Sequence, residues 1–318
     1  YDCNTLTSVA ISDTVKTINA YAFQSCENLT DINIPYGITT IGYYVFSGCK
    51  SLSNITIPDS VTSIGSNAFA SCDSISSITI PESVTEIGEG AFYDCNALTS
   101  ITIPYSVTNI GKNAFSLCDK LANIVVDENN QYYSSVDGAL LSKDKTRFLQ
   151  YPCGNTRTEY TMPNGVLSID GSAFAHCDNL ITVTLADTVT TIDDFAFTFS
   201  SRLANVIMGN SVTTIGDWVF SEGHSLVEIE LSDSLKTIGD TVFYNCGNLT
   251  TVIMGNYVTT IGGSAFYGCY ALKHVYYSGS PNQWQSINIY GGNDKLTKAN
   301  IHYYHNMKPV VTMPTCTE

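Results

Sequence analysis

The chain has 318 residues, of which 14 are lysine or arginine and 29 are aspartate or glutamate, so its formal net charge is −15. This charge repels nucleic acids and anionic membranes, and we therefore expect no nucleic-acid partner. No stretch approaches the roughly 20 apolar residues of a membrane span, so we expect no membrane insertion of this segment.

A phenylalanine and a cysteine three positions later recur along the chain at a fixed step of 23 residues. The phenylalanines are Phe23, Phe46, Phe69, Phe92, Phe115, Phe174, Phe197, Phe220, Phe243 and Phe266. The cysteines are Cys3, Cys26, Cys49, Cys72, Cys95, Cys118, Cys177, Cys246 and Cys269, with Ser200 and Gly223 in two places where the step calls for cysteine. A fixed period in this range predicts a stack of like coils rather than a globular domain with one catalytic cleft.

The repeat at residues 98–120 predicts the local structure of every coil. Ile101 and Ile103 alternate with Thr102, which indicates a short, half-buried strand. A proline often closes this strand, because it cannot donate to a sheet ladder. A second extended stretch ends at Gly111, where we expect a turn with positive φ. The Ala-Phe-x-x-Cys segment is too short for a free helix, and we expect one helical or 3₁₀ turn there.

The register breaks once, in a variant coil at about residues 127–162. Residues 138–142 and 147–152 are two short apolar stretches around a charged turn of four residues, which predicts a β-hairpin. We expect this hairpin to replace the Ala-Phe-x-x-Cys turn of its coil within one continuous stack. The polar segment 127–133 is expected to form a loop at the edge.

The run Ile-Thr-Ile-Pro-x-x-Val-Thr-x-Ile-Gly-x-x-Ala-Phe-x-x-Cys-x-x-Leu resembles the leucine-rich repeat of BspA-like bacterial surface proteins. The resemblance covers residues 1 to about 277 and includes the hairpin coil. It implies a leucine-rich-repeat solenoid on the outside of a cell or secreted, in a group linked to adhesion, host matrix proteins and co-aggregation. It implies no catalytic residues, and ligands on such a scaffold vary.

We therefore predict a repeat solenoid, a right-handed superhelix that is mainly β with short helical or 3₁₀ turns, over residues 1–277. Residues 278–304 are expected to form a C-terminal cap, and residues 305–318 a tail or a linker to a further module. The apolar residues that can cover the last coil are Trp284, Ile287, Ile289, Leu296 and Ile301. Because the chain enters the repeat partway through a turn, we expect it to be an excerpt whose signal segment lies upstream.

The chain has 11 cysteines, and three interpretations of them remain open. We favour buried free thiols, because Ser200 and Gly223 indicate that the ladder position requires a small residue. Scattered disulfides and metal binding are the alternatives, and Cys153 and Cys316 lie off the ladder and could differ. No Cys-x-x-Cys pair is present, so we expect no metal and no cofactor.

The outward residue in the middle of the first strand changes character along the chain. It is mostly polar or β-branched in the first coils and becomes apolar towards the C-terminus, at Ile207, Ile253 and Tyr276 around Glu230. A contiguous exposed apolar surface typically marks an interaction site, so these four residues are our candidate partner-binding patch. The alternative is local strand propensity or coverage by the C-terminal segment.

The function that we expect is non-enzymatic binding at the cell surface or after secretion, as adhesion of a monomer to a protein or a glycan. The alternatives are a scaffolding module of a larger secreted enzyme and a structural spacer at the cell wall.

Overall fold

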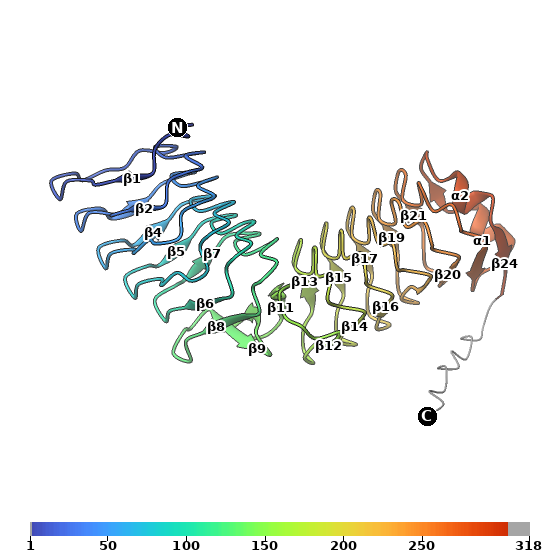
Figure 1. The fold of residues 1–318 in the computed structure, drawn as a ribbon. Helices are drawn as coiled ribbons and strands as arrows, with labels where there is room; N and C mark the ends of the chain where they lie inside the picture. The colour runs from blue at the N-terminus through green and yellow to red at the C-terminus, as the bar shows by residue number, and fades with distance from the viewer. Residues whose placement is uncertain (1, 305–318) are drawn as a thin grey trace, which may run out of the picture.

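The computed structural model describes residues 2–304. The chain winds through a series of similar coils, most of them with one or two short strands and a run of turns, from the N-terminal coils in blue to the C-terminal coils in orange (Figure 1). Equivalent strands pair in parallel at a step of 23 residues, as Thr214 with Thr237. The predicted leucine-rich-repeat solenoid of short parallel strands is confirmed.

The first strands of the coils lie on one side of the stack, which we call the first face. Their bounds are β1 Ser8–Val9, β2 Asp31–Ile32, β6 Ser100–Ile103, β8 Asn123–Val126, β12 Glu159–Thr161, β14 Thr182–Thr184, β16 Asn205–Ile207, β18 Glu228–Glu230, β20 Thr251–Met254, β22 His274–Tyr277 and β24 Asn300–His302. They pair as β1-β2, β6-β8, β12-β14-β16 and β18-β20-β22-β24. In β6 the isoleucines are buried and Thr102 is exposed, as the alternation predicts.

The second strands form the second face. Their bounds are β3 Thr40–Ile41, β4 Ser63–Ile64, β5 Glu86–Ile87, β7 Asn109–Ile110, β13 Ser168–Ile169, β15 Thr191–Ile192, β17 Thr214–Ile215, β19 Thr237–Ile238, β21 Thr260–Ile261 and β23 Asn288–Ile289. One sheet has the order β3-β4-β5-β7, and a nine-stranded sheet runs from β23 through β13 to the hairpin strands.

The Ala-Phe-x-x-Cys segment closes each coil as a run of tight turns, so the expected helical or 3₁₀ turn is wrong. Two residues of the run have left-handed backbone, for example Asn67 with φ 54° and Ser71 with φ 56°. Their positive φ interrupts any right-handed helix and directs alternate N–H groups out of the coil. The N–H of Phe69 donates to the carbonyl oxygen of Ala91 in the next coil at 2.8 Å.

The glycine at the end of the second strand has a different role from the predicted one. Its φ is not positive, and the left-handed residue lies two positions later, as Asn67 does after Gly65. A Cβ on Gly65 would lie 2.8 Å from the carbonyl carbon of Gly42 in the preceding coil. Glycine is required there because neighbouring coils approach closely, which is the other condition that favours this residue.

The phenylalanine ladder lies at the centre of the core, as predicted. Phe46, Phe69 and Phe92 are fully buried. Successive rings are nearly parallel, with centroids 5.4 and 5.3 Å apart. Burial of each such side chain contributes about 1.5–3 kcal/mol, and every ring depends on its neighbours for that burial.

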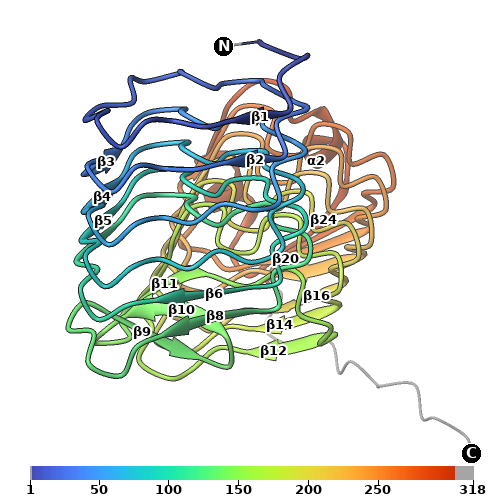
Figure 2. The same cartoon turned by 60° about the vertical axis from the view of Figure 1, so that its left-hand side comes forward.

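The predicted hairpin is confirmed, and it belongs to a larger meander. Strands β10 Ala139–Ser142 and β11 Arg147–Gln150 are antiparallel. A third strand, β9 Tyr133–Val136, pairs antiparallel with β10, so Tyr133 begins a strand where a loop was expected. We call β9, β10 and β11 the meander. In Figure 2 it lies in green across the end of the blue and teal coils.

The meander divides the hydrophobic interior into two clusters. Leu140 packs in the cluster of the coils before it, whereas Ala139 and Leu141 pack in the cluster of the coils after it. Successive side chains of a strand point to opposite faces, so β10 is the wall between two cores. We call the two sets of coils the N-terminal arm and the C-terminal arm, and they meet at an angle at the meander (Figure 1).

The segment after Tyr277 contains both helices, α1 Pro281–Gln285 and α2 Asp294–Thr297. Its apolar side chains pack on the C-terminal core, where Trp284, Ile287 and Leu296 are buried and Ile289 and Ile301 are partly buried. Strands β23 and β24 extend the two faces by one more strand each. The division of the chain at residue 277 stays a prediction, and the tail at 305–318 lies outside the described residues.

Candidate functional site

The four residues of the predicted patch lie on first strands of the C-terminal arm. Glu230, Ile253 and Tyr276 are direct neighbours in register, whereas Ile207 belongs to the adjacent sheet and pairs with Thr184. Ile207 is 56% exposed, but only 9% of Ile253 is exposed, so the expected exposure of Ile253 is wrong. In register it stands between Glu230 and Tyr276.

Tyr276 extends the patch towards the C-terminal end of the first face. Its ring stacks on the imidazole of His302 with centroids 4.5 Å apart. The Nε2 atom of His302 lies 3.0 Å from Nδ1 of His274, within hydrogen-bond distance. Sequence reasoning missed this cluster, although His274 and Tyr276 share one side of a strand because they are two residues apart.

The N-terminal arm carries a groove of about 680 Å³ on its first face. It crosses four consecutive coils. Its exposed lining residues are Ser8, Ala10, Asp31, Asn33, Ser53, Asn54, Thr56, Ser77 and Thr79. In the sequence, this region shows only the polar outward residues Asn33, Thr56 and Thr79. This pattern indicates a solvated sheet and does not predict a groove.

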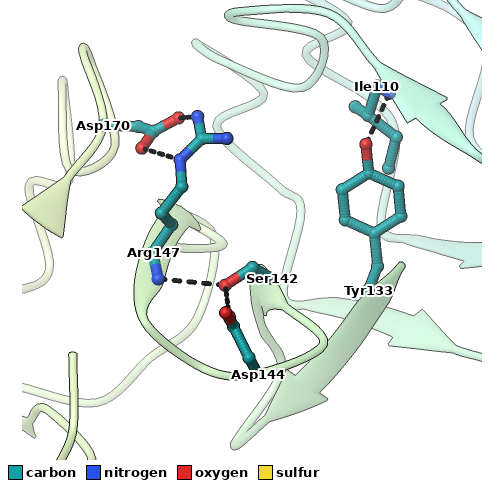
Figure 3. Close-up of polar contacts among 6 residues, drawn as sticks. All are labelled: Ile110, Tyr133, Ser142, Asp144, Arg147 and Asp170. Carbon is teal, nitrogen blue, oxygen red and sulfur yellow. Dashed lines mark hydrogen bonds and ion pairs between the residues drawn. The ribbon is translucent and has the colours of Figure 1, made fainter. Parts of the chain in front are cut away.

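A smaller pocket of about 130 Å³ lies where the arms meet, between β7 and the meander. Figure 3 shows its polar contacts: Arg147 binds the carboxylate of Asp170, with Nη2 to Oδ2 at 2.6 Å, and this hydrogen bond raises the pKa of Arg147. The hydroxyl of Tyr133 accepts a hydrogen bond from the N–H of Ile110 at 2.8 Å. Arg147 and Tyr133 are thus engaged in joining the arms, and the pocket has room for several water molecules.

The turn of the hairpin beside this pocket is held by its own side chains. The hydroxyl of Ser142 donates to the carboxylate of Asp144 at 2.6 Å and accepts from the N–H of Arg147 at 3.0 Å (Figure 3). The hydrogen bond from Ser142 lowers the pKa of Asp144. This carboxylate therefore stabilises the turn rather than acting as a proton donor.

The ladder cysteines are mostly buried free thiols, as predicted, with two exceptions. Cys153 and Cys177 form a disulfide, so the prediction is wrong for Cys177. The variant coil places Cys153 beside the ladder, with the two Cα atoms 4.4 Å apart. Cys3 is exposed, because no described coil packs against it on its outer side. Cys316 lies outside the described residues.

The buried thiols are poor nucleophiles. Burial raises the pKa of Cys49 and of Cys269 to about 12, so both are protonated at neutral pH. The thiolate is the reactive form of cysteine, and these side chains therefore act as packing groups.

Within residues 2–304, no group of three or more His, Cys, Asp or Glu side chains is arranged to hold a metal ion. In that same range, neither of the two helices is long and apolar enough to cross a membrane.

Comparison with protein families gives a match to the BspA type leucine rich repeat region over residues 1–122 and 148–290. The unmatched residues between these ranges include β9 and β10, which replace the ordinary turn of the repeat. No curated protein matches the chain.

Among solved structures, a leucine rich cell surface protein from Faecalibacterium prausnitzii is 32% identical, and the match covers 89% of this chain and 82% of that chain with a TM-score of 0.78. A leucine-rich repeat protein from Eubacterium ventriosum is 28% identical, over 85% of this chain and 78% of that chain, with a TM-score of 0.71. The pneumococcal vaccine antigen PcpA shares the fold at 22% identity, over 94% and 78% of the two chains, with a TM-score of 0.73.

Proposed function

The chain belongs to the family of BspA type leucine-rich repeat proteins, and we propose that it is a non-enzymatic binding protein of the bacterial cell surface. It attaches to a protein or a glycan through the outer surface of its solenoid. The relative from Faecalibacterium prausnitzii, which is described as a cell surface protein, supports this location.

The observation that carries the proposal is the number of tyrosines on the surface. Of the 20 tyrosines in the chain, all but Tyr1 lie within residues 2–304, and ten of those described are at least 46% exposed: Tyr21, Tyr36, Tyr43, Tyr105, Tyr132, Tyr257, Tyr267, Tyr270, Tyr290 and Tyr304. Tyrosine supplies a large, stiff side chain with an apolar ring and a polar tip, and it is enriched at recognition surfaces. Only 14% of the residues are charged, which leaves much of the surface to uncharged side chains.

Within this surface, the sequence-predicted patch is a proposed contact for a protein partner. Ile207 is exposed on β16, and Glu230 on β18 offers a carboxylate. Tyr276 on β22 is half-buried and presents part of its ring. Aromatic and aliphatic anchors of this type often contribute most of the binding free energy of an interface.

The test is a binding screen of the purified chain against host matrix proteins and against glycans, both immobilised. We expect saturable binding to at least one of them. The matched control is the same chain after thermal unfolding, which keeps composition and charge but loses the ordered surface. Absence of saturable binding in both panels would contradict the proposal.

A further inference from the structure

Between the coils of Ile34, Ile57 and Thr79, the first face of the N-terminal arm lacks the hydrogen bonds that join β12, β14 and β16 on the same face of the C-terminal arm. In the C-terminal arm, the N–H of Leu185 donates to the carbonyl oxygen of Ile207 in the next coil at 2.9 Å. The equivalent N–H groups of Ile34 and Ile57 have no acceptor among residues 2–304. Backbone groups in folded proteins are nearly always paired, so these groups need water or a ligand.

The carbonyl groups on the same strands are also open. The oxygens of Thr56 and Thr79, which should accept from Ile34 and Ile57, have no donor in the described part of the chain. The second face remains regular at these coils, where β4 pairs with β5. The coils are therefore separated on the first face only, and the groove of about 680 Å³ lies at this separation.

The protein itself shows which chemical group fits between these strands. One coil earlier, the side-chain amide of Asn33 accepts from the N–H of Ile11 at 2.8 Å and donates to its carbonyl oxygen at 2.9 Å. In the following coils the residues equivalent to Asn33 are Thr56 and Thr79, for which no such bond is formed. The vacant positions thus match a group that donates and accepts at once, as a hydroxyl does.

The side chains around the groove favour a sugar over a protein. Apart from Ala10, its exposed lining residues carry hydroxyl, amide or carboxylate groups, such as Asn54 and Ser77, and Asp31 is its one charged lining residue. The lining contains no tyrosine, tryptophan or arginine, the residue types that dominate protein–protein hot spots. The partly buried Ile55 offers an apolar patch for the C–H groups of a sugar ring.

We propose that this groove binds a short neutral oligosaccharide. Its volume lies within the range of about 300–1,000 Å³ of small-ligand sites. The net charge of −15 and the carboxylate of Asp31 repel sulfated and sialylated glycans. This inference rests on the proposed function and assigns a neutral glycan to this groove, separately from the protein contact proposed on the C-terminal arm.

The experiment uses immobilised neutral gluco-, galacto- and manno-oligosaccharides, with sialylated and sulfated glycans and host matrix proteins as separate arms. The variant is Thr56→Val with Thr79→Val, which removes two hydroxyls and keeps the β-branched shape. Its matched control is Thr161→Val with Thr184→Val, because these residues occupy the same place of the repeat where β12, β14 and β16 of the C-terminal arm are hydrogen-bonded to each other. All chains are first shown to have the same melting temperature.

We expect the parent chain to bind at least one neutral oligosaccharide. Its affinity should be weakened about tenfold in the groove variant, which corresponds to two lost hydrogen bonds, and changed less than about twofold in the control variant. No binding to any neutral oligosaccharide would overturn the inference, as would equal weakening in both variants. Binding only in the matrix-protein or anionic-glycan arm would overturn the inference and leave the proposed function intact. No binding in any arm would overturn both.

Discussion

The thiol of Cys95 donates a hydrogen bond to the carbonyl oxygen of Phe69 at 3.1 Å, one coil back in the stack. Equivalent bonds join Cys72 to Phe46 and Cys246 to Phe220. Ser200 replaces cysteine and keeps the bond, with its hydroxyl 2.7 Å from the carbonyl oxygen of Phe174. The ladder position thus requires a small residue, and a donor there links adjacent coils.

Substitutions at Cys95 test this requirement. Cys95→Ser should change the free energy of unfolding by less than about 1 kcal/mol, because the hydroxyl can replace the thiol as donor. Cys95→Leu should destabilise the protein by about 1–3 kcal/mol, because the fully buried position has no space for the larger side chain. Urea unfolding of both variants measures the difference, and equal stabilities would show that size does not matter at this position.

Phe92→Ala tests the phenylalanine ladder. Phe92 is fully buried between Phe69 and Phe115, with ring centroids 5.3 and 5.8 Å away. Its removal should cost about 3–5 kcal/mol in a urea titration, because a cavity opens between two coils. The control is Phe195→Ala, where the ring is 43% exposed and the expected cost is below about 1 kcal/mol. A small effect at Phe92 would contradict the role of the ladder as core.

Two adjacent glycines provide a matched test of coil spacing. A Cβ on Gly262 would lie 2.5 Å from the carbonyl carbon of Gly239, so Gly262→Ala should destabilise by about 1–3 kcal/mol. On Gly263 the nearest atom would be 3.7 Å away, and φ there is not positive. Gly263→Ala should therefore stabilise the protein by about 0.4–1 kcal/mol, because alanine reduces the conformational entropy of the unfolded chain. If Gly262→Ala had a higher melting temperature than Gly263→Ala, close approach of the coils would be ruled out as the reason for glycine at position 262.

The buried thiols predict a loss of stability at alkaline pH. Above about pH 8.5 the cysteines of the unfolded chain ionise, whereas Cys49 and Cys269 keep their protons in the folded state up to about pH 12. The folded state then binds more protons, so the free energy of unfolding falls with rising pH, by up to about 1.4 kcal/mol per pH unit for each thiol. Urea titrations between about pH 7.5 and 10 measure this slope.

The control for the alkaline effect is Cys49→Ser, which removes one ionisable group and keeps a hydroxyl in its place. Its free energy of unfolding should fall less steeply with pH than that of the parent chain. The difference between the two slopes is the contribution of the Cys49 thiol. Tyrosines contribute equally to both chains, so the difference isolates Cys49. Identical slopes would mean that Cys49 ionises alike in the folded and unfolded states.

The proposed protein contact is tested by replacing Ile207 and Tyr276 with threonine. Threonine stands in the same place of other coils, for example at Thr184, so the fold should persist. Affinity for a matrix protein identified in the screen should fall about tenfold or more, which is roughly 1.4 kcal/mol. The measurement is binding to that protein together with the melting temperature. Unchanged binding at an unchanged melting temperature would exclude these residues as a contact.

Much of the coil could be predicted because its interactions repeat with the sequence. The alternation of Ile101, Thr102 and Ile103 gave the half-buried first strand, and two apolar stretches around a charged turn gave β10 and β11. We expected the positive φ at Gly111, but Asn113 has the positive φ instead. A recurring glycine indicates that a side chain is not tolerated at that position. It does not indicate whether a turn or the close approach of a neighbouring coil is the reason.

The candidate surfaces were less predictable, since they depend on what lies beside each strand. Ile253 has the sequence pattern of an outward residue, yet only 9% of it is exposed. Thr56 and Thr79 looked like ordinary solvated positions, and the groove between them arises from the separation of coils on one face. A repeat that is uniform in sequence does not record such a local difference in spacing.

By itself, the sequence determined the period of 23 residues, the inward phenylalanine and cysteine ladders and the variant hairpin. These follow from the order of apolar and polar residues within one coil. Only the tertiary structure decided the wall of β10 between two cores, the pairing of Cys153 with Cys177 and the open first face of the N-terminal arm. Each of these depends on how one coil is placed against the next, where a small change in spacing decides which atoms meet.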